Sequence, residues 1–187
     1  MGKKEKIKIY LQYPWKASEC AYYTYLLTDS PNEIEYVTSK QEGGVIENKK
    51  KMMFYRNFKK NIKRILKKLG ITFVNLKKVN TKQNFNIIHG AHCLINSKKP
   101  WVADFEYVSQ VTFPMNKKRN KKVIKILKKE SCKKILPWTD WAREAILKTY
   151  PELKNKIETV YPGIPERNFK KKKHKGTNLL FVSRFFY

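Results

Sequence analysis

Arginine is scarce in this sequence, although positive charge is abundant. Only six of the 42 basic residues are arginine, the others are lysine, and the formal net charge is +27. Surfaces that bind nucleic acid favour arginine, whose planar guanidinium makes bidentate contacts with phosphates and base edges. We therefore interpret most of the charge as lysines on solvated faces, ahead of an anionic membrane surface and further ahead of nucleic acid.

Long apolar runs, closely spaced cysteines and a glycine-rich phosphate loop are also missing. No stretch of roughly eighteen apolar residues is present to form a transmembrane helix, and the N-terminal MGKKEKIKIY has no apolar signal core. The cysteines Cys20, Cys93 and Cys132 lack metal-ligand spacing and are predicted to be reduced thiols. No G-x-G-x-x-G motif follows the first predicted strand. These absences predict a cytoplasmic protein without a metal or other cofactor.

What the sequence does contain is an alternation of short apolar strands and amphipathic helices. With 41% hydrophobic and 13% aromatic residues, the chain can bury a core of its own. The alternation predicts the α/β class, with a Rossmann-like domain, a largely parallel sheet and right-handed crossovers. Strands are expected over residues 6–11, 34–37, 71–74, 86–89, 101–107, 133–137 and 157–161, and helices over 19–28, 56–69, 121–130 and 140–150.

The helix predicted over 56–69 is strongly amphipathic. Its apolar face consists of Phe58, Ile62, Ile65, Leu66 and Leu69, its other face is rich in lysine, and Gly70 is expected to end it. The favoured interpretation is that the apolar stripe packs against the sheet. The alternative is weak peripheral binding to an anionic membrane, such as the inner face of the cell membrane, where each nearby lysine can contribute about 1 kcal/mol.

The C-terminal stretch from residue 157 onward has the pattern of a crossing between two domains. Residues 157–161 predict a strand, which Pro162 and Gly163 break before a lysine-rich segment. Leu179 to Val182 is then a continuous apolar run, typical of a strand buried on both faces of a parallel sheet. We therefore expect a domain over residues 1–165, a basic linker over 166–176, and over 177–187 the first strand of a second domain that is absent.

This crossing resembles the interdomain segment of family 4 glycosyltransferases of the GT-B type. In that family a strand ending in a Gly-Ile turn leads through a linker to a strand running into Gly-Arg. Here the sequence reads Tyr-Pro-Gly-Ile-Pro and then LLFVSRFFY, with Ser183 in the place of that glycine and Arg184 in the place of the arginine. By resemblance, Arg184 would contact the diphosphate of the donor.

The resemblance implies the acceptor-binding half of a GT-B fold. Such enzymes move a sugar from a nucleotide-sugar to a lipid, glycan or small acceptor, with retention at the anomeric carbon, and most need no metal. Because the second domain holds most of the donor, this chain alone is expected to be inactive and not to bind nucleotide-sugars. The alternative, from another class of protein, is a noncatalytic basic module that binds an anionic membrane or another polyanion in a salt-dependent way.

The resemblance also implies where the acceptor would bind. The segment Ile-Ile-His-Gly-Ala-His is similar to the family's Asp-x-x-His-x-His, and its His92 lies just beyond a strand, where open α/β sheets place ligands. The loop after the first strand, with Trp15, Lys16 and Ser18, matches an acceptor-binding loop of the family. The other interpretation of Trp15 is that it only covers the edge of the sheet.

Two acidic residues stand where many family members carry a histidine that touches the sugar. Asp104 and Glu106 are two residues apart on a predicted strand, so their side chains should point the same way. They could accept hydrogen bonds from sugar hydroxyls or be neutralised by nearby lysines. We predict that His92 and Glu106 are catalytic and that Asp104 binds acceptor with the Trp15 loop. Because parallel strands open on one edge, these groups should converge on one cleft.

Overall fold

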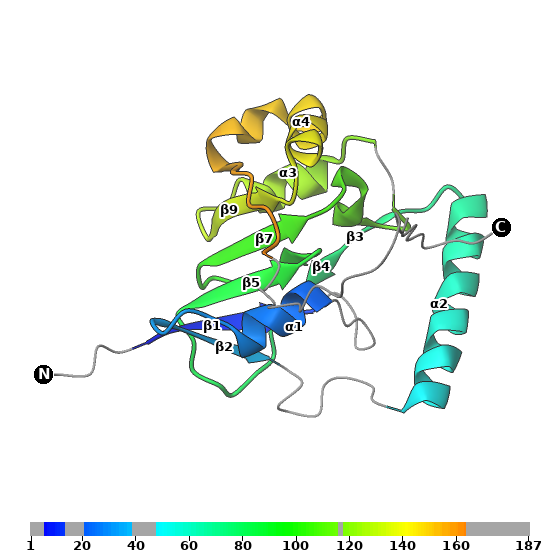
Figure 1. Ribbon diagram of the computed structural model, residues 1–187. Helices are drawn as coiled ribbons and strands as arrows, with labels where there is room; N and C mark the ends of the chain where they lie inside the picture. The colour runs from blue at the N-terminus through cyan, green and yellow to red at the C-terminus, as the bar shows by residue number, and fades with distance from the viewer. Residues whose placement is uncertain (1–5, 14–20, 39–47, 116–117, 164–187) are drawn as a thin grey trace, which may run out of the picture.

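A computed structural model describes residues 6–13, 21–38, 48–115 and 118–163 of the chain. Its centre is a five-stranded sheet in the order β2-β1-β5-β7-β9, with every neighbouring pair of strands parallel (Figure 1). This sheet confirms the predicted α/β class and its Rossmann-like character. The strands are β1 (Ile7–Gln12), β2 (Ile34–Thr38), β5 (Ile87–Ala91), β7 (Trp101–Phe105) and β9 (Cys132–Pro137).

Both faces of the sheet are buried, because successive side chains along a strand point to opposite sides. On β1, Tyr10 belongs to the larger apolar cluster and its neighbour Leu11 to the smaller one. Helices α3 (Lys121–Leu127) and α4 (Asp140–Thr149) contribute buried side chains to the larger cluster. Helix α1 (Ala21–Thr28) covers the smaller cluster and lies across the sheet (Figure 1).

Polar side chains fix the ends of α3 and α4. The Thr139 hydroxyl accepts a hydrogen bond from the Ala142 backbone N–H at 3.1 Å, so α4 begins where the sequence predicts. Helix α3 ends at Leu127, earlier than the predicted residue 130. There Lys156 Nζ donates to the carbonyl oxygens of Leu127, Lys129 and Cys132, at 3.0, 2.7 and 2.8 Å. These bonds satisfy carbonyls at and just beyond the end of the helix, which have no partner within it.

Two short ribbons flank the main sheet. Strand β3 (Phe73–Val74) pairs antiparallel with β8 (Thr112–Phe113), and β4 (Leu76–Lys77) pairs parallel with β6 (Leu94–Ile95). The strand predicted over 71–74 therefore lies outside the main sheet. The other three strands were not predicted, because two residues are too few to show an alternating pattern.

Helix α2 (Lys49–Lys68) begins earlier than the predicted residue 56. The Asn48 side chain accepts a hydrogen bond from the Lys51 N–H at 3.1 Å and caps the helix there. The helix therefore includes seven residues, 49–55, before its predicted start. The other end confirms the predicted terminator: Gly70 has φ +66°, and the N–H groups of Gly70 and Ile71 bond the Lys67 and Leu66 carbonyls at 3.2 and 2.9 Å.

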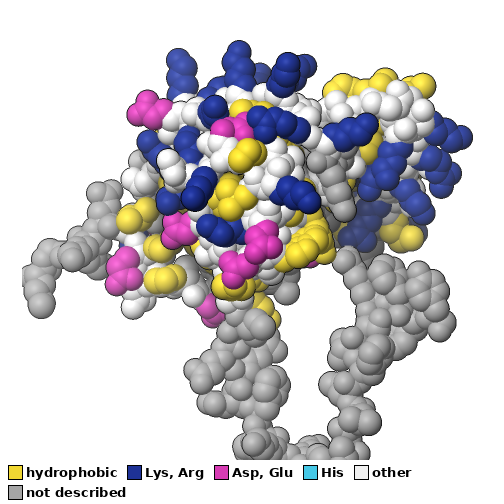
Figure 2. Space-filling view, turned by 90° about the horizontal axis from the view of Figure 1, so that it is seen from above, with side chains coloured by type: hydrophobic (Ala, Val, Ile, Leu, Met, Phe, Trp, Pro, Cys, Tyr) yellow, Lys and Arg dark blue, Asp and Glu magenta, His cyan; other side chains and the backbone are white. Residues whose placement is uncertain are grey.

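Most of the apolar stripe of α2 faces outward, and within it Ile62 and Leu66 are half-buried. Phe54 is 75% exposed and Phe58 56% exposed, and Ile65 and Leu69 are exposed as well. The favoured expectation, that this stripe packs against the sheet, is therefore wrong. Figure 1 shows α2 standing beside the sheet, on the side to which the strands point, while α1, α3 and α4 occupy the faces. Viewed from above, lysines and exposed hydrophobic side chains gather where α2 lies (Figure 2).

The segment after the 3₁₀ helix η3 (Pro151–Lys156) follows β9 without completing a strand. Ile157 forms an isolated bridge with Ile135, and the N–H groups of Glu158 and Val160 bond the Ile135 and Pro137 carbonyls, both at 3.0 Å. The strand predicted over 157–161 is therefore reduced to a bridge. The predicted linker and the predicted first strand of a second domain lie outside the described residues. Among the described helices, none combines the length and apolar character needed to cross a bilayer.

Candidate functional site

The strand order defines where a ligand would enter. From β1 the chain passes first to β2, on one side of β1, and later to β5, on the other side. The topological switch point therefore lies between β1 and β5. In open α/β sheets, ligands bind at this point, outside the carboxyl ends of the strands. Here β1 ends at Gln12 and β5 ends at Ala91, and the Cys93 thiol donates to the Gln12 carbonyl at 3.7 Å.

A tight turn follows β5 and presents His92. His92 has φ +51°, in the left-handed region that non-glycine residues seldom occupy. Gly90 makes room for the turn, since a Cβ added there would lie 2.6 Å from the Cys93 carbonyl oxygen. The turn therefore depends on a glycine two residues before the histidine, and the spacing Gly-Ala-His encodes this geometry.

The carboxylate of Asp104 is the centre of a buried polar cluster. Asp104 is 2% exposed at the carboxyl end of β7. The Tyr23 hydroxyl lies 2.8 and 2.9 Å from its two oxygens, the His92 backbone N–H donates to Oδ1 at 2.9 Å, and His89 Nε2 donates to Oδ2 at 3.1 Å. These contacts join α1, β5, β7 and the His92 turn. Asp104 therefore holds the backbone of the His92 turn in place, which favours a positioning role for the Asp104 side chain.

Burial and charge act in opposite directions on this cluster. Burial would raise the pKa of Asp104, but the charge and hydrogen bond of His89, with contributions from His92, outweigh it and hold the pKa below its usual value. Burial lowers the pKa of His92, more than Asp104 and Glu106 raise it. At neutral pH the site thus pairs an ionised carboxylate with a neutral His92 imidazole, which can both donate and accept a hydrogen bond.

Two polar residues that sequence reasoning missed support the turn from the other side. Buried Asn75 donates from Nδ2 to the carbonyls of His92 and Gln110, at 2.9 and 3.0 Å. The Gln110 side chain, from the 3₁₀ helix η2 (Val108–Val111), accepts from the N–H groups of Glu106 and Tyr107, at 2.8 and 3.1 Å. A lone Asn or Gln carries no spacing signal, so neither could be found without the fold.

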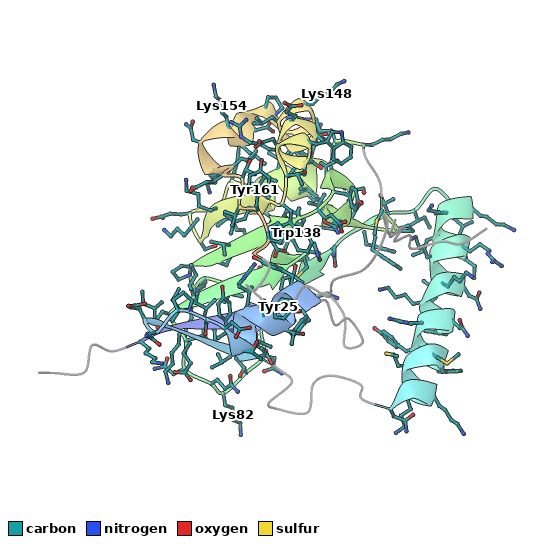
Figure 3. All side chains as sticks on the ribbon, viewed as in Figure 1. Tyr25, Lys82, Trp138, Lys148, Lys154 and Tyr161 are labelled. Carbon is teal, nitrogen blue, oxygen red and sulfur yellow. The ribbon has the colours of Figure 1, made fainter. Side chains whose placement is uncertain are left out.

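Aromatic rings form one wall of the site. The Trp138 ring, just after β9, lies 4.7 Å from the His92 ring and 5.1 Å from that of Tyr22. Figure 3 shows Trp138 near the middle of the molecule, between α1 and α4. Trp138 Nε1 and His92 Nδ1 are buried atoms without a hydrogen-bond partner in the described part of the chain. Two such atoms on neighbouring rings are suited to a polar ligand group.

Further out on the same edge, an aromatic pair is open to solvent. Tyr107 follows β7, and Trp141, 62% exposed, lies in the first turn of α4. Their ring centroids are 6.0 Å apart and nearly perpendicular. Glu106, partly exposed between β7 and η2, lies close enough to His92 for its charge to act on the histidine's pKa. The edge thus combines a carboxylate, an imidazole and exposed aromatic faces.

The structure brings together three of the seven residues predicted for the site. His92, Asp104 and Glu106 all lie at the carboxyl ends of the adjacent strands β5 and β7. His89, the first histidine of the Ile-Ile-His-Gly-Ala-His segment, lies in β5 as a buried hydrogen-bonded residue. The other four, Trp15, Lys16, Ser18 and Arg184, lie outside the described residues. The catalytic and binding roles of all seven stay predictions.

Comparison with known proteins adds no identification to this geometry. Among the described residues, no three His, Cys, Asp or Glu side chains group closely enough to hold a metal ion. No protein-family model, curated protein or solved structure matches the chain.

Proposed function

We propose that this chain is the acceptor-binding half of a sugar transferase that uses a nucleotide-sugar donor. The observation that carries the proposal is the neutral His92 held by buried Asp104 at the topological switch point of a parallel sheet. A ligand-binding histidine needs a fixed orientation, and the contacts from Asp104 and Asn75 to the His92 backbone provide it. The glycosyltransferase resemblance of the sequence names the reaction class.

In this proposal the acceptor hydroxyl binds beside His92 and Glu106. His92 donates or accepts one hydrogen bond to position the hydroxyl, and Glu106 takes its proton as the oxygen forms the new bond to the anomeric carbon. The bond from that carbon to the departing diphosphate breaks in the same process. Tyr107 and Trp141 offer aromatic faces on which the apolar face of a sugar ring can stack. The donor is bound mainly by a partner domain, with Arg184 contributing to its diphosphate.

Acceptor binding by the isolated chain should be weak but dependent on His92. We expect His92→Asn to weaken binding of simple glycosides by about fivefold in saturation-transfer NMR, since one hydrogen bond to a neutral group contributes about 1 kcal/mol. Asparagine tolerates the left-handed backbone of this turn, so the fold should persist. Glu33→Gln, on the loop before β2, is the matched control. Equal binding by all three proteins, or transfer from a nucleotide-sugar by this chain alone, would contradict the proposal.

The second candidate is peripheral binding to an anionic membrane, and the outward stripe of α2 favours it. Ten of the twenty residues of α2 are Lys or Arg and none is acidic. The exposed Phe54 and Phe58 rings lie 6.5 Å apart, nearly parallel, on one side of the helix. A helix with a basic face and exposed aromatic rings lies well in the interface of an anionic bilayer. Helix α2 lies on the side of the sheet to which the strands point, and the candidate site is at that edge (Figure 1). Membrane binding through α2 would therefore suit a lipid acceptor.

Membrane binding should require both the rings and the charge. We expect the double variant Phe54→Ser and Phe58→Ser to bind vesicles containing anionic lipid at least tenfold more weakly, since burying each ring contributes about 1.5–3 kcal/mol. Ile7→Ser is the control, because Ile7 is an exposed apolar residue on β1, at the far end of the sheet from α2. The measurement is co-sedimentation with neutral and anionic vesicles. Equal sedimentation with both vesicle types, or no effect of the double variant, would exclude this role.

A further inference from the structure

A shallow cavity lies at the edge of the sheet opposite to the candidate site. It is lined by the loops that lead into β5 and β7, so it lies at the amino ends of these strands, whereas His92 and Glu106 follow their carboxyl ends. Its volume is about 290 Å³, near the lower limit for pockets that hold small organic molecules. The cavity therefore suits a compact ligand, and it shares no residue with the candidate site or with α2.

The floor of the cavity is apolar. Val79 and Phe85 line it, and both side chains also pack against the larger apolar cluster. The Phe85 ring lies 5.3 Å from the ring of Tyr10 on β1. Pockets for small molecules combine such an apolar base with a few polar groups that fix the orientation of the ligand.

The rim of the cavity supplies the polar groups. Lys99 Nζ lies 4.1 Å from the centroid of the Phe85 ring and donates to the Phe85 carbonyl at 3.4 Å, so the ammonium group is held at the cavity wall. The Lys99 backbone N–H donates to Ser97 Oγ at 2.9 Å, and the Ser97 O–H can donate to a ligand. Lys98 brings a second ammonium group to the same rim.

The chain does not neutralise the positive charge at this rim. Among the described residues, no carboxylate forms an ion pair with Lys98 or Lys99. The two partners of the Lys99 ammonium, a ring face and a carbonyl oxygen, are uncharged. Residues 75–100 contain no aspartate or glutamate but five lysines, which are Lys77, Lys78, Lys82, Lys98 and Lys99. An anion in the cavity would therefore be attracted without having to displace an ion pair.

We propose that this cavity binds a small organic anion, whose phosphate or carboxylate group lies between Lys98, Lys99 and the Ser97 hydroxyl. Ammonium and hydroxyl groups donate to the oxygens of either anion, and hydrogen bonds assisted by charge are among the stronger ones in proteins. The carbon atoms of the ligand rest on Val79 and Phe85. The volume suits a molecule the size of a sugar phosphate or a short dicarboxylate. The site rests on neither sugar transfer nor membrane binding.

Amide signals in NMR spectra test the site in the full chain without substitution. With ¹⁵N-labelled protein, millimolar glycerol phosphate or succinate should shift the signals of residues 81–85 and 97–99. Residues 105–111, at the other edge of the sheet, should not respond. A response to glycerol phosphate identifies a phosphate ligand and a response to succinate alone identifies a carboxylate ligand; either supports the site. No response to either probe, or equal shifts at both edges, would overturn the proposal.

Paired variants then separate the cavity from general attraction to a basic protein. Lys99→Met should weaken binding of the responding probe about tenfold in calorimetry, because a hydrogen bond to a charged group is lost. Lys82→Met should weaken it less than about twofold. Lys82 is the matched control, because it lies in the loop before β5 but does not line the cavity, and Figure 3 shows it pointing away from the rest of the molecule.

A third variant tests the cavity itself. Ser97→Leu fills part of the space and removes a donor while every charge stays, so binding should be lost although the net charge is unchanged. Circular dichroism checks that each variant folds, and the amide shifts of the unsubstituted chain decide the question if one does not. Equal losses in the two lysine variants, or unchanged binding by Ser97→Leu, would show general charge attraction and exclude the site.

Discussion

Replacing Asp104 with alanine is expected to lower the free energy of unfolding by about 3–5 kcal/mol. Its carboxylate accepts from the Tyr23 hydroxyl, the His89 imidazole and the His92 backbone N–H inside a buried site. Alanine would leave all three donors without an acceptor, and each buried polar group that loses its partner keeps its desolvation penalty. Because domains are typically stable by 5–15 kcal/mol, this change alone could unfold a large part of the population. Urea denaturation followed by circular dichroism measures the loss.

Graded variants separate the contributions. Tyr23→Phe removes one donor and leaves the carboxylate its other two, so a loss of about 1 kcal/mol is expected. Asp29→Ala is the control, because that residue lies at the exposed end of α1 and, among the described side chains, bonds only its neighbour Thr28; its cost should stay within about 0.5 kcal/mol. A loss of unfolding free energy below about 1 kcal/mol for Asp104→Ala would show that this carboxylate does not hold α1, β5 and the His92 turn together.

The same cluster gives the stability a defined pH dependence. The pKa of Asp104 is lower in the folded chain, so its contribution is fully present above its unfolded pKa of about 4 and is lost as the pH falls through the folded pKa. The pKa of His92 is also lower in the folded chain, so protonation favours the unfolded state as the pH falls below about 6.5. The unfolding free energy should therefore decline in two stages, and Asp104→Asn should lack the lower stage.

The Gly90→Ala substitution is expected to cost about 2–3 kcal/mol, a large loss for one added methyl group. The new Cβ would lie 2.6 Å from the Cys93 carbonyl oxygen and 3.0 Å from the Ile95 side chain. The carbonyl belongs to the backbone of the His92 turn, so the clash can be relieved only by shifting that turn. Besides the stability loss, acceptor binding should fall, because His92 would move with the turn.

Two other glycines serve as controls for this prediction. A Cβ at Gly163 meets no atom within 4 Å, so Gly163→Ala should be nearly neutral. Gly70 has the same open space but φ +66°, so Gly70→Ala should cost about 1–2 kcal/mol through backbone strain alone. Thermal unfolding of the three variants ranks them. A Gly90→Ala protein as stable as Gly163→Ala would show that the turn relaxes without cost.

Local sequence signals were sufficient for the main sheet and for most helix positions. Short apolar or alternating segments located β1, β2, β5, β7 and β9, because strands with one or both faces buried carry such patterns. These signals were not sufficient to predict which neighbours the sides of a helix contact. The stripe of α2 has the right periodicity for packing, but periodicity shows only that apolar residues share a side. Whether the sheet has a free face for that stripe depends on α1, α3 and α4, and no local pattern contains this information.

The candidate site, too, could be predicted from the sequence only in part. The position of His92 followed from a general rule about strand ends, and the structure places Glu106 at the same edge. The role of Asp104 as a buried acceptor did not follow, because its partner Tyr23 is 81 residues away in the chain. Asn75 was missed for the same reason: its two bonds reach across 17 and 35 residues. Long-range hydrogen bonds leave no spacing signal in a single sequence.

The bonds of Glu158 and Val160 to β9 determine where the chain leaves the sheet before Gly163. They carry the backbone toward the carboxyl end of β9, at Pro137, which is the edge that also holds His92. Anything joined after Gly163 is therefore tethered at the mouth of the candidate site and not at its far side. In general, a short tether holds a linked domain at an effective concentration in the millimolar range. A tethered domain could thus deliver a ligand to this edge efficiently even if its own affinity for the sheet were only millimolar.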